Sequence, residues 1–417
     1  MMTTENATIE ITCGGDRFGA VTASWASGWG AVLALSLCAA ALVASEFMPV
    51  SLLTPIASDL RISEGQAGQA IAVSGGFALL TSLLISSLTR KIDRRVVLLG
   101  LTLTMMVSSA MVAFAPSAVV FMAGRALVGV VIGGFWSMSA STAMRLVPEP
   151  EVPRALGVLN GGNALATTVA APLGTFLGQY IGWRGAFFVV VPVAAITFAW
   201  LYASLPSMPA ADRRGEATVF RVLRRPLVPA GMTAVTLFFF GQFALYTYVR
   251  PFLETVTRVD VSALSLMLLM MGVAGLAGTY IIGALITTGL SRVLFLTPVA
   301  MAAVAIALTL TGRAPIAAGV LLTAWGLLGT AAPVPWWTWL SRVLPDDAEA
   351  GGGLMVAVIQ MAIALGAAGG GVLYDSSGYR STFVLSAFAL VASALLARMA
   401  WRDNRTATAA HAAVTLH

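Results

Sequence analysis

Long runs of apolar residues, separated by short polar segments, fill the chain from residue 29 to residue 402. A helix needs about 20 mostly apolar residues to cross the hydrocarbon core of a bilayer. The pattern therefore predicts an all-α membrane protein with twelve transmembrane helices, at 29–53, 69–89, 96–115, 117–144, 155–181, 185–205, 228–253, 262–285, 293–311, 315–340, 352–374 and 381–400.

The longest polar stretch between two predicted spans, residues 206–227, divides the chain into two six-helix halves, 29–205 and 228–402. Residues 1–28 and 403–417 are predicted to form terminal tails. The first tail lacks the basic, apolar and small-residue regions of a signal peptide in their usual order, so we expect no cleavage there.

Short motifs recur at the same place in each half. The recurring motifs are GWRGAF at 182–187 with GYRSTF at 378–383, and RLVP at 145–148 with RVLP at 342–345. The two separations are 196 and 197 residues, and at 196 Glu46 corresponds to Gln242. Two six-helix repeats related by an axis along the membrane normal are the architecture of major facilitator transporters, with the substrate site between them. We therefore predict two pseudo-symmetric halves.

Composition and charge agree with a membrane location. The chain is 58% hydrophobic and only 10% charged, against about 25% charged residues in soluble domains. The net charge of +6 follows topology: with a cytoplasmic N-terminus, seventeen Lys and Arg lie inside and six outside. Positive charge concentrates on the cytoplasmic side of membrane proteins. We expect a bacterial inner-membrane protein in the lipid bilayer, with both termini cytoplasmic and no nucleic-acid partner.

One acid and one base lie deep in predicted spans, namely Glu46 and Arg125. An isolated charge at the bilayer centre costs about 2.5–3.5 kcal/mol on insertion scales, so such residues mark functional sites. Both are predicted to lie at similar depth in the outer half, where they pair or share a water-filled cavity. Burial favours a neutral acid and a nearby arginine favours the carboxylate. We hypothesise that Glu46 couples transport to protons; the alternative is a static ion pair.

Uncharged polar and aromatic residues in the spans are candidates for contact with a substrate. The polar candidates are Gln242, Asn160, Asn163 and Gln360, and the aromatic candidates are Phe135, Trp136, Tyr246 and Trp336. The alternative for the polar group is hydrogen bonding between helices. The alternative for the aromatic group is the interfacial belt. Pro333 and Pro335 beside Trp336 are expected to interrupt that helix.

Several classes of function lack the residues that they need. There is no phosphate-binding Gly-rich motif, and no histidine lies in any predicted span. Glu46 has no second carboxylate with which to form an aspartyl-type dyad. Cys13 and Cys38 have no metal-site or disulfide spacing. We expect no enzyme activity, no metal and no cofactor.

Three segments resemble signatures of the major facilitator superfamily. SSLTRKIDRRVVLL resembles the Gly-x-Leu-Ala-Asp-Arg-x-Gly-Arg-Arg loop, whose role in the family is gating. Arg90 stands at its Asp, Asp93 at its second Gly, and Arg94 and Arg95 are retained. GRALVGVVIGG resembles the second signature and places Arg125 at its arginine. AAPLGTFLG keeps part of the antiporter signature.

A broader resemblance covers nearly the whole chain. EFMPVSLLTPIASDLRISEGQAGQ, GGFWSMSASTAMRLVPEPEVPRAL, GQFALYTYVRP and AVIQMAIALGAAGGG resemble purine ribonucleoside efflux pumps of the drug:proton antiporter branch. The resemblance implies a monomeric secondary transporter that exports inosine-like and guanosine-like nucleosides in exchange for protons. Proton-coupled export of sugars or drugs remains the alternative.

Overall fold

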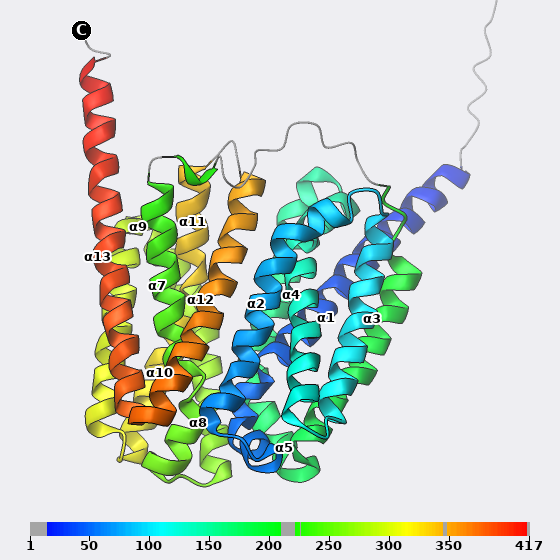
Figure 1. The fold of residues 1–417 in the computed structure, drawn as a ribbon. Coiled ribbons are helices and arrows are strands. Elements are labelled where there is room, and N and C mark those ends of the chain that lie inside the picture. The colour runs from blue at the N-terminus through cyan, green and yellow to red at the C-terminus, as the bar shows by residue number, and fades with distance from the viewer. Residues whose placement is uncertain (1–14, 210–221, 226, 345–347, 415–417) are drawn as a thin grey trace, which may run out of the picture.

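The computed structural model describes residues 15–209, 222–225, 227–344 and 348–414. Parts of both predicted tails and of the predicted central loop lie outside the described residues. The residues outside are 1–14, 210–221, 226, 345–347 and 415–417. The described chain is almost entirely helical (Figure 1). The all-α prediction is therefore confirmed.

The helices follow the order of the predicted spans. The N-terminal half contains α1 (Gly15–Leu60), α2 (Glu64–Leu88), α3 (Arg94–Ala113), α4 (Ala118–Leu146), the short turn η1 (Glu149–Glu151) and α5 (Val152–Ser204). The C-terminal half contains α7 (Val228–Tyr246), α8 (Val249–Phe252), the π turn η2 (Leu253–Thr257), α9 (Val261–Thr311), α10 (Pro315–Gly329), α11 (Pro333–Val343), α12 (Ala348–Ser377) and α13 (Tyr379–Val414).

Eleven stretches of the described chain are long and apolar enough to cross a membrane. One of them, Glu149–Ser204, contains two predicted spans and is interrupted at Gly182, whose φ of 73° and ψ of 166° are not helical. Division at Gly182 gives the twelve spans that the hydropathy pattern predicts. Helix α9 likewise contains two spans, which separate at Gly289.

Helix bounds differ from the predicted spans at several places. Helix α1 begins at Gly15 and α13 ends at Val414, so both extend beyond the apolar runs that defined the predictions. The predicted span at 315–340 is divided into α10 and α11, with Pro333 at the start of α11. The interruption expected from the prolines is confirmed, because proline lacks the N–H that a continuing helix needs.

The sequence repeat is visible in the backbone. Gly182 and Gly378, 196 residues apart, both join consecutive spans with positive φ, at 73° and 77°. That region is readily open only to glycine. Phe187 and Phe383 follow them at the same separation, and both are fully buried.

A second matched pair brings helices close together in each half. A Cβ atom on Gly129 of α4 would lie 2.3 Å from the carbonyl oxygen of Ser74 on α2. A Cβ atom on Gly326, 197 residues later, would lie 2.0 Å from the carbonyl oxygen of Met271, which is 197 residues after Ser74. Small residues allow helices in membranes to approach closely. The two halves therefore repeat the same helix contact.

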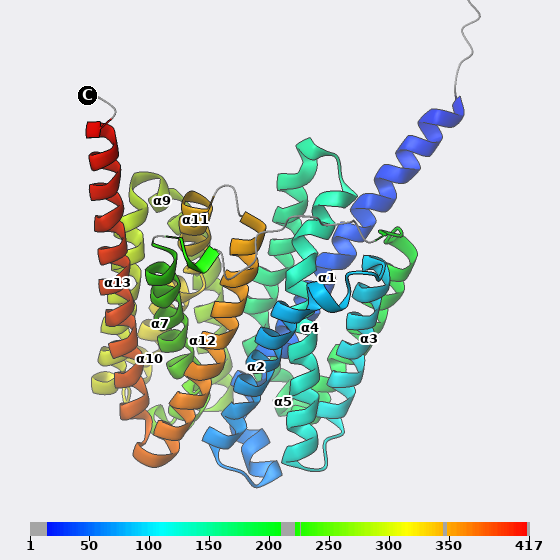
Figure 2. The same cartoon turned by 45° about the horizontal axis from the view of Figure 1, so that its top comes forward.

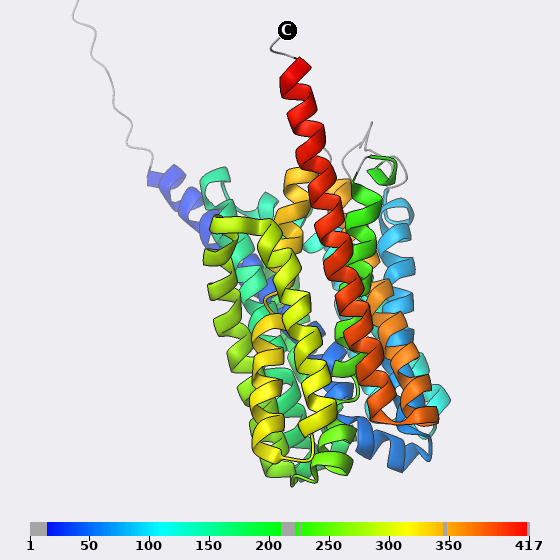
Figure 3. The ribbon, with the colours of Figure 1, turned by 90° about the vertical axis from the view of Figure 1, so that its left-hand side faces the viewer.

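The two bundles stand side by side, with α2 and α12 adjacent along their boundary (Figures 1 and 2). Helix α1 begins and α13 ends at the same end of the molecule, which we name the terminal end; the opposite end is the far end (Figure 1). Helices α10 and α13 lie with part of α9 on the outer side of the C-terminal half (Figure 3). The first span of α9 instead meets the N-terminal half, where Thr168 Oγ1 on α5 donates to the carbonyl oxygen of Gly272 and Ser265 Oγ on α9 donates to the carbonyl oxygen of Pro172.

Candidate transport site

Arg125 on α4 is fully buried and joins three helices of the N-terminal half. Its Nη1 donates to the carbonyl oxygen of Ser45 at 2.7 Å, and its Nη2 to the carbonyl oxygen of Glu46 and to Ser74 Oγ, each at 3.1 Å. Its Nε reaches the carbonyl oxygen of Ala70 at 3.4 Å. Arg125 thus ties α4 to both α1 and α2.

The sequence of α1 explains why a carbonyl is available to Arg125. Pro49 lies inside α1, four residues after Ser45. Because proline has no N–H, it cannot donate the helical hydrogen bond to the carbonyl oxygen of Ser45. An unpaired buried carbonyl is costly, and the guanidinium of Arg125 supplies the missing donor.

Glu46 lies beside Arg125, as predicted, but the two side chains form no direct ion pair. Within the described residues, ion pairs closer than 4.0 Å join Arg154 to Glu151, Arg184 to Asp59 and Arg250 to Glu254. The guanidinium binds the backbone of Glu46 instead of its carboxyl group. The structure thus places the two side chains close together without a direct ion pair, because the guanidinium donates to backbone carbonyl oxygens of α1. The other form of the expectation, a shared water-filled cavity, stays a prediction.

The carboxyl group of Glu46 contacts the other half of the molecule. Gln360 on α12 donates from Nε2 to Glu46 Oε1 over 3.4 Å. Both side chains are buried, with 6% of Glu46 and 5% of Gln360 exposed. Within the described residues, Gln360 Oε1 is buried without a hydrogen-bond partner. The one deep carboxyl group therefore lies at the boundary between the halves.

Next to this contact, aromatic rings from both halves meet. Phe47 on α1 stacks on Phe243 of α7, with centroids 5.8 Å apart and planes inclined by 25°. Tyr246 approaches Phe47 edge-on at 6.3 Å. Phe47 and Phe243 are equivalent positions of the repeat, since they are 196 residues apart. The segment Glu46-Phe47 and its repeat Gln242-Phe243 therefore meet at the boundary.

Gln242, the counterpart of Glu46, also has an unused polar atom. Its Oε1 is buried without a partner among the described residues, as is Nε1 of Trp325 on α10. Gln242 Nε2 lies close to Gly329, since a Cβ atom added there would be 2.9 Å from it. With Gln360 Oε1, these are buried polar atoms whose hydrogen-bonding capacity is unused in the described structure.

Other aromatic candidates lie inside the separate halves. Phe135 is buried in the core of the N-terminal half, where it contacts Trp136 edge-on at 5.5 Å. Trp336 is buried in the core of the C-terminal half against Phe238 and Trp339. The structure therefore does not bring Phe135 or Trp336 to Glu46.

The two asparagine candidates lie on α5. Asn160 is exposed and donates from Nδ2 to the carbonyl oxygen of Leu156 on its own helix at 2.9 Å. Asn163 is partly buried, and its backbone carbonyl oxygen accepts a hydrogen bond from Thr167 Oγ1. The described structure shows no hydrogen bond from either side chain to Glu46, Gln242 or Gln360.

The predicted gating loop is fastened to the end of α5. Asp93 caps α3 and accepts hydrogen bonds from Ser207 Oγ and from the backbone N–H of Met208 and Arg95. Burial raises the pKa of the Asp93 carboxyl, but these hydrogen bonds outweigh it and hold the pKa below its usual value.

The arginines of this loop take different positions. Arg95 donates to the carbonyl oxygen of Tyr202 at 2.7 Å, and Arg94 donates to Ser141 Oγ at 2.8 Å. Arg90 is exposed. The contacts of Asp93 and Arg95 described here lie within the N-terminal half, so the gating role of the loop remains a prediction.

Hydrogen bonds also join the two halves between the middle and the far end of the bundle. Asp375 at the end of α12 accepts from Ser63 Oγ and from the backbone N–H of Gly65, at the start of α2. Arg250 donates to the carbonyl oxygen of Ser51 on α1. The carboxylate of Asp375 lies at the N-terminus of α2, where a helix dipole favours negative charge.

Glycines allow this close approach at the far end. A Cβ atom on Gly68 of α2 would lie 2.1 Å from the hydroxyl oxygen of Tyr248, and one on Gly371 of α12 would lie 2.4 Å from it. The hydroxyl group of Tyr248 donates to the carbonyl oxygen of Ala367 at 2.8 Å. The far end of the boundary is therefore closely packed.

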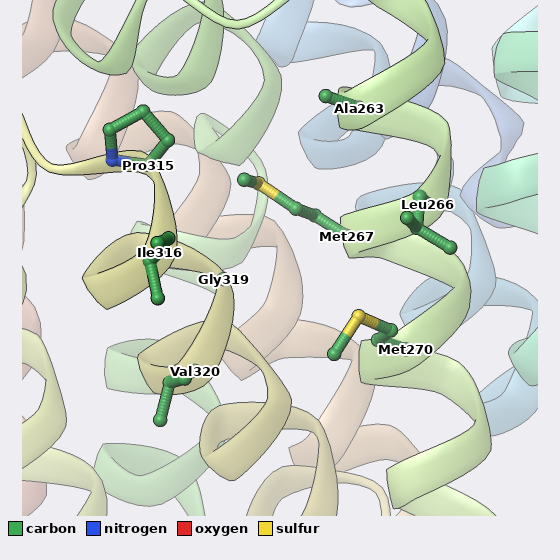
Figure 4. Close-up of a pocket in the computed structure, with 8 residues that line it drawn as sticks. All are labelled: Ala263, Leu266, Met267, Met270, Pro315, Ile316, Gly319 and Val320. Atoms are coloured by element: carbon green, nitrogen blue, oxygen red, sulfur yellow. The ribbon is translucent and has the colours of Figure 1, made fainter.

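An apolar crevice lies between α9 and α10. Met267 and Met270 of α9 face Ile316 and Val320 of α10 across it (Figure 4). No polar side chain lines this crevice in the described structure. It has no means of orienting a polar substrate, so the candidate transport site is the boundary around Glu46.

Two features of this site were absent from the sequence candidates. Phe47 and Phe243 meet across the boundary, although only their polar neighbours were predicted. The repeat that aligned Glu46 with Gln242 also aligned these two rings, and positions related by a two-fold axis meet when they lie near it. Pro49 was the available signal for an unpaired carbonyl on α1.

Comparison with known proteins gives concordant relationships. The sequence model of the Major Facilitator Superfamily matches residues 33–352. A Pseudomonas aeruginosa protein named transcription regulatory protein OpdE is 56% identical over 383 residues, or 91% of this chain and 95% of that protein. The Escherichia coli purine ribonucleoside efflux pump NepI is 42% identical over 368 residues, or 88% of this chain and 93% of the pump.

Solved structures give the same fold. The structure of a bacterial homologue of the human lysosomal transporter Spinster, in an inward-facing and unoccupied conformation, aligns with a TM-score of 0.73. The alignment covers 90% of this chain and 97% of that one, at 15% sequence identity. The human organic anion transporter MFSD10 aligns with a TM-score of 0.66 and 16% identity. At these identities the likeness concerns the fold.

Proposed function

Because this chain belongs to the major facilitator superfamily, we propose that it exports purine ribonucleosides from the bacterial cytoplasm in exchange for protons. The observation that carries the proposal is the position of Glu46. The one carboxyl group deep in a described span lies at the boundary of the halves and contacts Gln360 of the opposite half. Transporters of this architecture bind their substrate between the halves near mid-membrane.

The proposed direction of transport follows from the arrangement of charge. Lys and Arg are concentrated at the terminal end of the predicted spans, and we assign that end to the cytoplasm of the inner membrane. The bonds from Asp375 and Arg250 join the halves at the far end. We assign this arrangement to the state that is closed to the outside and receives substrate from the cytoplasm.

The polar groups at the boundary suit a neutral, polar substrate. Gln242 and Gln360 each present a buried amide oxygen without a partner, and both amides are uncharged. Phe47 and Tyr246 offer aromatic surface beside them, on which a purine ring stacks favourably. The identity of 42% to a purine ribonucleoside efflux pump supports this class of substrate. Sugars and drugs are the alternative substrates.

Proton coupling is assigned to Glu46. Arg125 lies close enough for its charge to act on the Glu46 carboxyl and favours the carboxylate, whereas burial favours the protonated acid. In the proposed cycle, Glu46 takes up a proton while the site is open to the outside and releases it to the cytoplasm. Release of the proton permits substrate to bind, and the loaded protein then opens outward. The proposed transporter acts as a monomer, with one boundary site per chain.

The name of the 56% identical relative raises a second function, control of transcription. A chain built from membrane-spanning helices can reach transcription through the small molecule that it transports. We therefore propose that any regulatory effect of this chain follows from its export activity. In a deletion strain, restored transcript levels would then require a transport-competent protein, and Glu46→Gln would fail to restore them. Restoration by this variant would favour a regulatory role independent of transport.

The direct test is transport of radiolabelled inosine into proteoliposomes under an imposed proton gradient. We expect gradient-driven inosine movement with the wild type and its loss in Glu46→Gln. Glutamine mimics the protonated acid, to which substrate does not bind in the proposed cycle, so the variant should also lose exchange of internal for external inosine while still folding, as checked by size-exclusion chromatography. Absence of inosine movement with folded wild-type protein would refute the nucleoside assignment, and sugars and drugs would be assayed next.

A further inference from the structure

Among the described residues, the side-chain amide of Gln360 forms a hydrogen bond through its N–H group but not through its oxygen. Its Nε2 donates to Glu46 Oε1 at 3.4 Å, while its Oε1 is buried without a partner in the described structure. These two atoms belong to one planar amide, so its free acceptor lies next to the donor that contacts Glu46. A buried polar atom without a partner is costly, and its partner is therefore expected in another state of this site.

The missing partner is a proton donor, and Glu46 supplies one when it is protonated. An ionised carboxyl group only accepts hydrogen bonds, whereas a protonated one also has an O–H donor. A carboxylic acid and a primary amide form a ring of two hydrogen bonds, N–H to C=O and O–H to C=O. A carboxylate cannot complete that ring, and its negative charge repels the amide oxygen.

We propose that Gln360 is a positioning residue that binds the protonated form of Glu46 and thereby couples proton uptake to closure of the far end. This inference rests on the proton coupling proposed above. It adds a second role for Gln360 to the substrate contact expected from the sequence. When Glu46 takes up a proton, its O–H donates to Gln360 Oε1 and the two halves are joined by two hydrogen bonds instead of one.

The location of Gln360 makes this contact sensitive to movement of the halves. The backbone of Gln360 lies against α2. A Cβ atom on Gly75 of α2 would be 2.9 Å from the backbone carbonyl oxygen of Gln360 and 3.0 Å from the Cβ atom of Ala364. Further along α12, Gln69 of α2 donates to the carbonyl oxygen of Ala368. Separation of α2 from α12 therefore also separates the amide from Glu46.

Few titratable groups face Glu46. Arg125 on α4 acts on the Glu46 carboxyl group by its charge. Tyr246 on α7 contacts Phe47, the residue that follows Glu46. The other charged or titratable groups of α1, α2, α4, α5, α7 and α12, with Tyr248 just after α7, lie toward the helix ends, near the Gly182 junction or further along α1: Asp16, Arg17, Cys38, Asp59, Glu64, Arg145, Arg154, Tyr180, Arg184, Tyr202, Tyr248, Glu349, Tyr374 and Asp375. Glu46 is therefore the group whose charge changes at this contact.

The competition between Arg125 and Gln360 gives the site two states. Arg125 stabilises the carboxylate, and Gln360 stabilises the acid while the far end is closed. When the site opens toward the cytoplasm, water reaches the Glu46 carboxyl group and accepts its proton. The acceptor Oε1 of Gln360 is then free again, while Nε2 still donates to the carboxylate, and a substrate hydroxyl group can donate to Oε1.

The first test measures the protonation of Glu46 without any substrate. The infrared C=O stretch of a protonated carboxyl group is followed against pH and assigned by its absence in Glu46→Gln. In Gln360→Met, which keeps the side-chain length, we expect roughly tenfold weaker proton binding by Glu46, the effect of about one hydrogen bond. Gln360→Asn shortens the side chain by one methylene and should weaken proton binding by Glu46 to the same extent. This variant replaces Gln360→Met in the test if the methionine variant does not fold.

Gln242→Met is the matched control, because Gln242 is the other amide with a buried, unpartnered oxygen and makes no hydrogen bond to Glu46 in the described structure. It should leave the titration of Glu46 unchanged. An unchanged titration in Gln360→Met, or an equal change in Gln242→Met, would overturn the proposal. Failure of the wild type to move inosine would refute the nucleoside assignment alone, because the titration contains no nucleoside.

The second test measures closure of the far end. Spin labels are placed on the exposed Arg61→Cys and Ser376→Cys, in opposite halves, with Cys13 and Cys38 replaced by serine. We expect the short-distance population to increase as the pH falls in the wild type and to become independent of pH in Gln360→Met. The same dependence on pH in both proteins would refute the link between protonation and closure.

Discussion

The two halves share a backbone plan but differ in polarity at their centres. Gly129 and Gly326 bring corresponding helices into equally close contact, and Gly182 and Gly378 join corresponding spans with the same positive φ. The separation of 197 residues that relates Gly129 to Gly326 takes Arg125 to Leu322. Leu322 is fully buried in an apolar cluster, where the other half has a guanidinium bound to backbone carbonyls.

This difference shows which features the duplicated fold needs. Close helix contacts and the glycine junctions occur twice, so we attribute them to the architecture. The charged group on α4 and the carboxyl group on α1 occur once, and their counterparts are Leu322 and Gln242. Since a buried charge in a membrane is costly, its presence in one half indicates a function that the fold alone does not require.

The largest effect is expected when the N-terminal half is given the side chain of its counterpart. Arg125→Leu removes the donor to the carbonyl oxygen of Ser45, which Pro49 leaves without a helical partner. A buried carbonyl without a partner costs about 1–3 kcal/mol, and α1 and α2 lose their shared anchor. We expect transport to be abolished and the yield of folded protein to fall, as measured by uptake and by size-exclusion chromatography.

Arg125→Lys tests the same anchor with the charge retained. A lysine ammonium lacks the planar fork with which Arg125 reaches two carbonyl oxygens, so this variant should also lose most transport. Normal activity in Arg125→Lys would show that charge near Glu46, rather than the anchoring of α1, is the requirement. The matched control in the other half, Leu322→Met, should leave transport intact.

An exchange of the two central polar residues tests whether the halves are interchangeable. The double variant Glu46→Gln with Gln242→Glu keeps one acid, in the same aromatic region of the boundary. The new acid lies in the half where Leu322 replaces Arg125. We expect gradient-driven transport to stay at least roughly tenfold below that of the wild type. Recovery of proton-driven uptake would show that the arginine in the first half is not needed for coupling.

The close glycine contacts should respond alike in both halves. Gly129→Ala and Gly326→Ala each place a methyl group within 2.3 Å of a backbone carbonyl oxygen on the neighbouring helix. Overpacking of this kind costs about 1–3 kcal/mol. We expect similar decreases in the midpoint of thermal unfolding in detergent for the two variants. Gly100→Ala, where a Cβ atom meets nothing within 4 Å, is the control and should unfold as the wild type does.

The fold was predictable because its signals are local or repeated. The length of the apolar runs predicted the spans. The two pairs of repeated motifs, separated by 196 and 197 residues, predicted the halves. The site was less predictable because most spans are apolar on every side. In such helices the sequence does not show which side faces the boundary. Phe135 and Trp336 were therefore as plausible as Tyr246, although they lie in the cores of the separate halves.

Contacts across the boundary were harder still to predict. Glu46 and Gln360 are 314 residues apart, and no motif relates them. Arg125 was correctly placed near Glu46, since both were deep and alone, but its bond to a backbone carbonyl depends on the missing N–H of Pro49. Pro49 marks a carbonyl on α1 that needs a donor, but several helices contain a proline, and the sequence does not show which side chain supplies the donor.

The smallest effect is expected at the two glycine junctions, where the halves agree most closely. Gly182 and Gly378 have φ values of 73° and 77°, and a Cβ atom on either would meet nothing within 4 Å. Alanine substitution therefore introduces backbone strain without a steric clash, at a cost of about 1–3 kcal/mol for a sparsely populated backbone region. Gly182→Ala and Gly378→Ala should lower the thermal midpoint slightly and equally, with transport nearly unchanged. A much larger loss in one variant would mean that its junction moves during transport, and the two halves would then differ in mechanics as well as in charge.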